Sequence, residues 1–94
     1  MILTFADKET SRLAAGLRSR KLPPDIQEKA MRLLRVMADC EDWNDLRQPP
    51  GNRLHALRGN REGQYAVRIN RQWRIAFRPV GGVLADVEVT DYHE

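Results

Sequence analysis

The chain has 94 residues, of which 41% are hydrophobic and 31% are charged, as is typical of one small globular domain. No apolar run approaches the roughly 20 residues of a membrane-spanning helix, and the start turns polar after five residues, which argues against a secretory signal. One cysteine, Cys40, excludes an internal disulfide, and one cysteine with two histidines fits no zinc-binding spacing. We therefore expect a single domain over residues 1–94, without a metal or cofactor, in a reducing cytoplasm.

The first part of the chain predicts a short strand followed by two helices. Residues 1–5 (MILTF) are apolar and prone to form a strand. Residues 7–20 predict a helix that ends in basic residues and carries apolar residues at helical spacing, namely Leu13, Ala14 and Leu17. Residues 23–40 predict a second helix with proline in its first turn and one apolar stripe, namely Ile26, Ala30, Leu33, Met37 and Cys40.

The second half of the chain changes to a period of two, which is typical of strands. Residues 42–53 predict a loop or a short helical turn that ends in Pro-Pro-Gly. A short strand around His55 and three longer antiparallel strands then follow, and in the last of them Val83, Ala85, Val87 and Val89 alternate with other residues. The predicted fold class is α+β, in the order β-α-α-β-β-β-β, with both helices on one face of a small antiparallel sheet.

The apolar pattern also predicts how two of these strands pair. All apolar groups lie on one side, under the helices, if the pairs are Tyr65 with Phe77, Val67 with Ile75 and Ile69 with Trp73. Arg68 then lies opposite Arg74 on the helix-free face, where like charges destabilise a sheet unless something neutralises them. Either an acid of the last strand, Asp86 or Glu88, neutralises the two arginines, or this face binds an anion.

Arginine is concentrated in the middle of the chain. Residues 47–78 contain eight arginines, no lysine and a single acid, Glu62. Such a segment can be a plain solvated surface, but the planar guanidinium group favours bidentate contact with phosphate or carboxylate. The segment is therefore suited to a nucleic acid or to an acidic protein partner.

The same region holds the group types that ribonuclease chemistry without a metal requires. One group must take the proton of the 2′-hydroxyl, another must protonate the departing 5′-oxygen, and cations must stabilise the charged intermediate. Imidazole groups titrate near neutral pH and suit the proton transfers. The residue types needed are supplied by His55, Arg58, Arg74 and His93, while Asp91 could orient an imidazole and Tyr92 could stack on a base or donate its hydroxyl.

Two stretches together resemble a known family. Residues 52–78 (NRLHALRGNREGQYAVRINRQWRIAFR) and the ending DVEVTDYHE are similar to the HigB-type toxins of the RelE/ParE superfamily, and the similarity extends over the whole chain. The resemblance implies a small antiparallel sheet with two N-terminal helices on one face. It also implies the toxin half of a toxin–antitoxin pair, which cleaves mRNA on the translating ribosome. The implied partners are a HigA-type helix-turn-helix antitoxin, the ribosome and mRNA, with operator DNA reached only through the antitoxin and no membrane.

The resemblance also assigns site residues. The active-site positions of the family fall on His55, Arg58, Arg74, Asp91, Tyr92 and His93. The family usually has lysine where this chain has Arg58, and because a guanidinium group does not release its proton, we expect a purely electrostatic role for Arg58. The remaining arginines of this surface are predicted to bind RNA phosphates, namely Arg53, Arg61, Arg68, Arg71 and Arg78.

Two other functions remain open. A ParE-like toxin of the same superfamily would bind and inhibit DNA gyrase without cleaving RNA, but His55 and the DYHE ending argue against it. An arginine-rich nucleic-acid-binding protein without catalysis would explain the charge and leave the two histidines without a role. A downstream reading frame that encodes a small helix-turn-helix protein would favour the HigB-type toxin.

Overall fold

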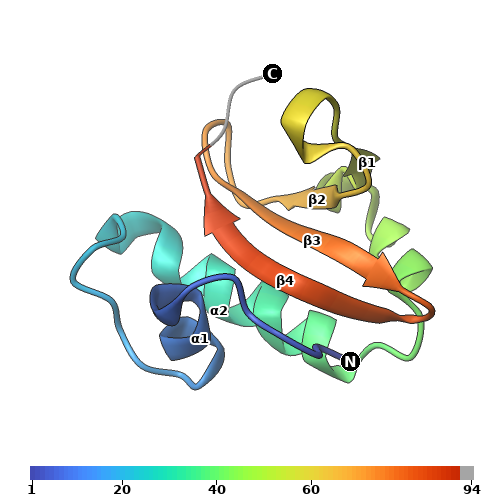
Figure 1. Ribbon diagram of the computed structural model, residues 1–94. Helices are drawn as coiled ribbons and strands as arrows, with labels where there is room; N and C mark the ends of the chain where they lie inside the picture. Colours follow the sequence, from blue (N-terminus) through green and yellow to red (C-terminus); the bar gives the residue numbers. More distant parts are fainter. Residues whose placement is uncertain (92–94) are drawn as a thin grey trace.

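A computed structural model of the protein describes residues 1–91 (Figure 1). The chain forms helices α1 (Lys8–Ala14) and α2 (Pro24–Asp39), then strands β1 (His55–Ala56), β2 (Tyr65–Arg68), β3 (Arg74–Val80) and β4 (Val83–Thr90). The four strands form one antiparallel sheet in chain order. Figure 1 shows both helices on one face of this sheet, so the predicted α+β fold is confirmed.

The pairing of β2 with β3 has the predicted register. Tyr65 pairs with Phe77, Val67 with Ile75 and Arg68 with Arg74. The apolar members of these strands join the buried cluster that the two helices cover, and the stripe of α2 from Ile26 to Met37 belongs to the same cluster. No helix within residues 1–91 combines the length and the apolar character that a membrane span requires.

Strand β4 departs from the predicted alternation at Asp86. Ala76 pairs with Glu88, but Arg78 pairs with Ala85, so an irregularity interrupts the ladder, and Asp86 takes a φ of 52° there. Such a bulge adds a residue on one strand and exchanges the faces of the residues that precede it. The prediction was therefore wrong for Val83 and Ala85: Leu84 enters the core beneath the helices, and Ala85 lies on the helix-free face with Arg78.

Helix α1 is shorter than predicted. It ends at Ala14, and Gly16 follows with a φ of 81°. The amide of Gly16 donates to the carbonyl of Leu13 (3.0 Å) and that of Leu17 to the carbonyl of Arg12 (2.9 Å), which is the hydrogen-bond pattern of a Schellman cap. Leu17 is therefore outside the helix and 51% exposed, contrary to the prediction.

The predicted first strand is present only as two isolated bridges. The first residues of the chain run parallel to β4, with Ile2 beside Leu84 and Phe5 beside Val87. Four main-chain hydrogen bonds of 2.7–3.1 Å join this N-terminal segment to β4. The segment thereby covers the outer edge of β4, which would otherwise be open to another chain.

A buried amide that the sequence pattern did not predict fixes the connection between the two helices. Gln27 of α2 is 1% exposed. Its Nε2 donates to the carbonyls of Ser19 (2.8 Å) and Leu22 (2.8 Å), and its Oε1 accepts from the amide of Ser19 (2.9 Å). The side chain thus supplies hydrogen-bond partners to a turn that is not part of any helix or strand.

Candidate anion-binding and active site

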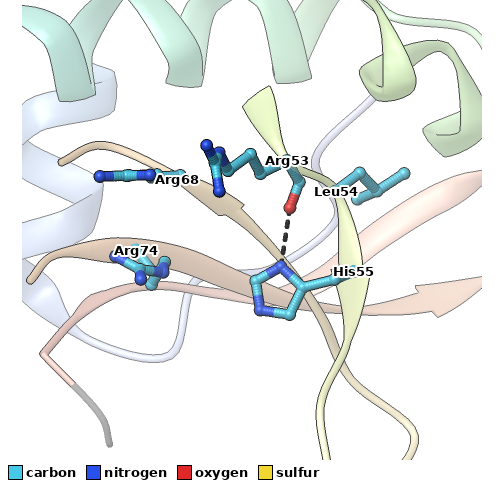
Figure 2. A pocket seen from close by; sticks show the side chains of 5 residues that line it. All are labelled: Arg53, Leu54, His55, Arg68 and Arg74. Carbon is cyan, nitrogen blue, oxygen red and sulfur yellow. Dashed lines mark hydrogen bonds between the residues drawn. The ribbon is translucent and has the colours of Figure 1, made fainter. Parts of the chain in front are cut away.

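The helix-free face carries a pocket of about 440 Å³. Figure 2 shows its lining side chains, which are Arg53, Leu54, His55, Arg68 and Arg74. Three guanidinium groups and one imidazole therefore surround the same opening. This combination favours an anion and includes a group that can transfer a proton.

Arg68 and Arg74 reach the pocket from neighbouring strands at the turn between β2 and β3. The Nε of Arg68 donates to the main-chain carbonyl of Asn70 (3.1 Å), and Nη1 of Arg74 donates to the same oxygen (2.6 Å). Within residues 1–91, neither guanidinium group forms an ion pair with a carboxylate. Two like charges are thus held opposite each other with a carbonyl between them, and an anion would be attracted to them.

The acids proposed to neutralise this pair bind other arginines instead. Glu88 accepts from Nη1 of Arg61 (3.2 Å), and Asp86 accepts from Nε of Arg78 (3.1 Å). Of the two possibilities that the sequence left open, this geometry favours anion binding at Arg68 and Arg74.

His55 lies on β1, which pairs with β2 through His55 and Ala66. Ala66 is on the same face as Arg68, so the imidazole is presented on the helix-free face. The Nδ1 of His55 lies 2.7 Å from the carbonyl oxygen of Arg53 (Figure 2). Because a carbonyl can only accept, this contact assigns the proton to Nδ1, and in the neutral ring the lone pair is then on Nε2. A ring oriented in this way can accept a proton at Nε2.

A small second cluster supports the segment that carries His55. Leu57 packs with Ala66 and Ala76 on the helix-free face, and all three are buried. Arg61 of the following loop reaches across the sheet and donates to Glu88 (3.2 Å) and to the hydroxyl of Thr90 (3.5 Å) on β4. The segment between β1 and β2 is therefore held in two places, by Leu57 against β2 and β3 and by Arg61 against β4.

The pocket unites four of the predicted site residues, namely Arg53, His55, Arg68 and Arg74. Arg58 and Arg71 are exposed and do not line it, while Arg61 and Arg78 are ion-paired.

Asp91 directly follows β4, whose last residue, Thr90, pairs with Arg74. The carboxylate of Asp91 accepts from Nε2 of Gln72 (2.7 Å). The end of β4 is therefore beside Arg74. The predicted site residues Tyr92 and His93 lie outside the described residues.

Sequence reasoning missed two contributors to this site, Leu54 and Asn70. Leu54 lines the pocket between Arg53 and His55. Only its position between two predicted site residues indicated that it belongs to the site. Asn70 precedes the turn between two predicted strands, where asparagine is frequent because its side chain bonds to nearby amides. The frequency of asparagine in turns predicts a turn here, but it does not predict that Arg68 and Arg74 donate to the carbonyl of Asn70.

Comparisons with known proteins identify the family of the chain. A family model described as the RelE-like toxin of the type II toxin–antitoxin system HigB matches residues 3–93. Toxin HigB-1 of Vibrio cholerae is 37% identical over 84 residues, which make up 88% of each chain. Endoribonuclease HigB of Proteus vulgaris is 37% identical over 41 residues, 44% of this chain and 45% of that protein.

Two solved structures share the fold at low sequence identity. A histidine-to-glutamine variant of YafQ from E. coli has a TM-score of 0.61 and 15% identity, and covers 97% of this chain and 93% of its own. A YoeB/ParE toxin from Agrobacterium tumefaciens has a TM-score of 0.57 and 16% identity over 99% of this chain and all of its own. The family model, which spans nearly the whole sequence, decides the assignment: this chain belongs to the HigB family of RelE-like toxins of type II toxin–antitoxin systems.

Proposed function

We propose that this toxin is an endoribonuclease that cleaves mRNA on the ribosome and uses side chains rather than a metal ion for the chemistry. The observation that carries the proposal is the pocket in which Arg53, Arg68 and Arg74 surround an opening next to the oriented imidazole of His55. The name of the relative from Proteus vulgaris, an endoribonuclease, supports the same activity.

In the proposed reaction, the 2′-hydroxyl of one nucleotide loses its proton and attacks the adjacent phosphorus. The 5′-oxygen leaves with a proton, so the products carry a 2′,3′-cyclic phosphate and a 5′-hydroxyl. We assign the more direct role in proton transfer to His93, which Asp91 and Tyr92 can position and tune, and His55 is the second proton-transfer group or a phosphate ligand. Arg58 and Arg74 stabilise the charge that develops on the phosphorane.

The other arginines bind the RNA chain. Arg53 and Arg68 line the same pocket as Arg74, so we assign them to the RNA phosphates nearest the cleavage point. Arg71 is exposed and suits a neighbouring phosphate. Arg61 and Arg78 already face carboxylates, so we assign them to weaker contacts farther along the RNA.

The partners follow from the substrate and the family. We propose that the ribosome presents the mRNA, because the described face offers cations but few aromatic groups on which to order single-stranded bases. A HigA-type antitoxin with a helix-turn-helix domain neutralises the toxin and links it to operator DNA. An enzyme with this substrate acts in the cytoplasm.

The test compares mRNA bound to purified ribosomes with the same mRNA alone. Primer extension is expected to show cuts within codons only when ribosomes are present, and His55→Ala and Arg74→Ala are expected to reduce them. Products ending in a cyclic phosphate agree with the side-chain mechanism, whereas products with a 5′-phosphate and a 3′-hydroxyl contradict it. Wild-type protein that leaves ribosomal mRNA intact but blocks DNA supercoiling by gyrase would establish the ParE-like alternative.

A further inference from the structure

The turn between β2 and β3 contains a side chain to which the proposed mechanism gives no role, Asn70. Its Oδ1 accepts from the main-chain amides of Gln72 (2.8 Å) and Trp73 (2.7 Å). These bonds form an Asx turn, in which the side-chain carbonyl replaces the main-chain carbonyl in closing the turn. The main-chain carbonyl of Asn70 can therefore accept other donors.

The donors that use this carbonyl are the two arginines of the pocket. The Nε of Arg68 is 3.1 Å from the oxygen, and Nη1 of Arg74 is 2.6 Å from it. The two arginines are direct cross-strand partners, so their charges repel unless something lies between them. One shared oxygen accepts from both groups beside the pocket, and Nη1 of Arg74 also donates to the carbonyl of Trp73 (3.2 Å). Each guanidinium keeps further N–H groups for a ligand.

We propose that Asn70 is the positioning residue of the anion site. Its side chain closes the turn so that its main-chain carbonyl holds Arg68 and Arg74 in the arrangement that receives an RNA phosphate. The identity of the ligand rests on the proposed ribonuclease function, whereas the arrangement of the two arginines does not. Without the side chain, the amide of Trp73 turns to the main-chain carbonyl and competes there with both guanidinium groups.

Three variants separate this role from a general effect on folding. Asn70→Ala removes the Oδ1 acceptor, and Asn70→Asp retains it. Asn60→Ala is the matched control, because Asn60 is an exposed asparagine in the loop after β1.

The first measurement is hydrogen exchange of the arginine Nε–H groups by NMR on the purified protein. The Nε–H of Arg68 is expected to exchange more slowly than that of the exposed Arg71 in the wild type, in Asn70→Asp and in Asn60→Ala. In Asn70→Ala the exchange of Arg68 is expected to rise about tenfold, as the loss of one hydrogen bond predicts.

The second measurement is a titration with inorganic phosphate. The dissociation constant is expected to rise about tenfold in Asn70→Ala and to stay at the wild-type value in Asn60→Ala.

The proposal is wrong if Asn70→Ala leaves both the exchange of Arg68 and the affinity for phosphate unchanged, even if mRNA cleavage falls. It is also wrong if Asn70→Asp loses the slow exchange. If Asn70→Ala does not fold, the wild-type protein alone provides the test. Equal exchange rates at the Nε–H groups of Arg68 and Arg71 in the wild type would overturn the proposal. If the exchange results are as expected but the wild-type protein cleaves no mRNA, the ribonuclease function fails and the positioning role of Asn70 stands.

Discussion

Replacing Gln27 with leucine tests whether the connection between the helices depends on one buried amide. The side chain makes three hydrogen bonds to the main chain of Ser19 and Leu22, and it is 1% exposed. Leucine has a similar size but leaves these groups without partners. At about 0.5–1.5 kcal/mol for each hydrogen bond, the free energy of unfolding should fall by about 2–4 kcal/mol. For a domain of this length, that loss lowers Tm by about 10–25 °C.

The assay is urea and thermal unfolding followed by circular dichroism. Gln48→Leu is the matched control, because Gln48 is exposed, and it should remain within about 0.5 kcal/mol of the wild type. Gln27→Glu should also be destabilised, because a buried carboxylate cannot donate to the two carbonyls. A stability of Gln27→Leu within about 0.5 kcal/mol of the wild type would refute the reasoning.

Three further changes test the site and the core separately. Arg74→Ala should lower mRNA cleavage on ribosomes by about 10²-fold or more, as loss of one stabilising donor does elsewhere, whereas Arg35→Ala, an exposed arginine of α2, should cleave like the wild type. Arg68→Ala should reduce the slope of log affinity for single-stranded RNA against log salt concentration by about 0.7, measured by fluorescence anisotropy; an unchanged slope would remove Arg68 from the RNA interface. Thr10→Val should cost about 1–3 kcal/mol in urea unfolding, because the buried Thr10 hydroxyl accepts from the amide of Val89 (2.9 Å), and a neutral result would mean that this bond adds nothing.

Apolar patterning was sufficient to predict the fold and the register of β2 with β3. Only one pairing keeps Tyr65, Val67 and Ile69 on the side of the helices, so the position of Arg68 opposite Arg74 followed from it. The bulge in β4 could not be predicted, because it requires a positive φ at Asp86, and the presence of an aspartate in a strand does not indicate a positive φ.

The candidate site was predictable in its residue types but not in its connections. Glu88 pairs with Arg61 because the loop that carries Arg61 folds across the sheet. No local sequence pattern predicts the course of that loop. The bonds from Arg68 and Arg74 to the carbonyl of Asn70 involve the main chain, which is the same for every residue type. The roles of Arg58 and of the end of the chain came from residue type and from the family resemblance.

The pairing of the N-terminal segment with β4 has a consequence for the order of folding. Ile2 and Phe5 are separated from their partners, Leu84 and Val87, by most of the described residues. Contacts between such distant parts of a chain form slowly, because a long loop must close before they contribute any stability. The strand that they join also carries Glu88 and Thr90, which fasten the loop beside His55. We therefore expect the contacts of the N-terminal segment with β4 to form late in folding, and the face that carries His55 to be completed with them.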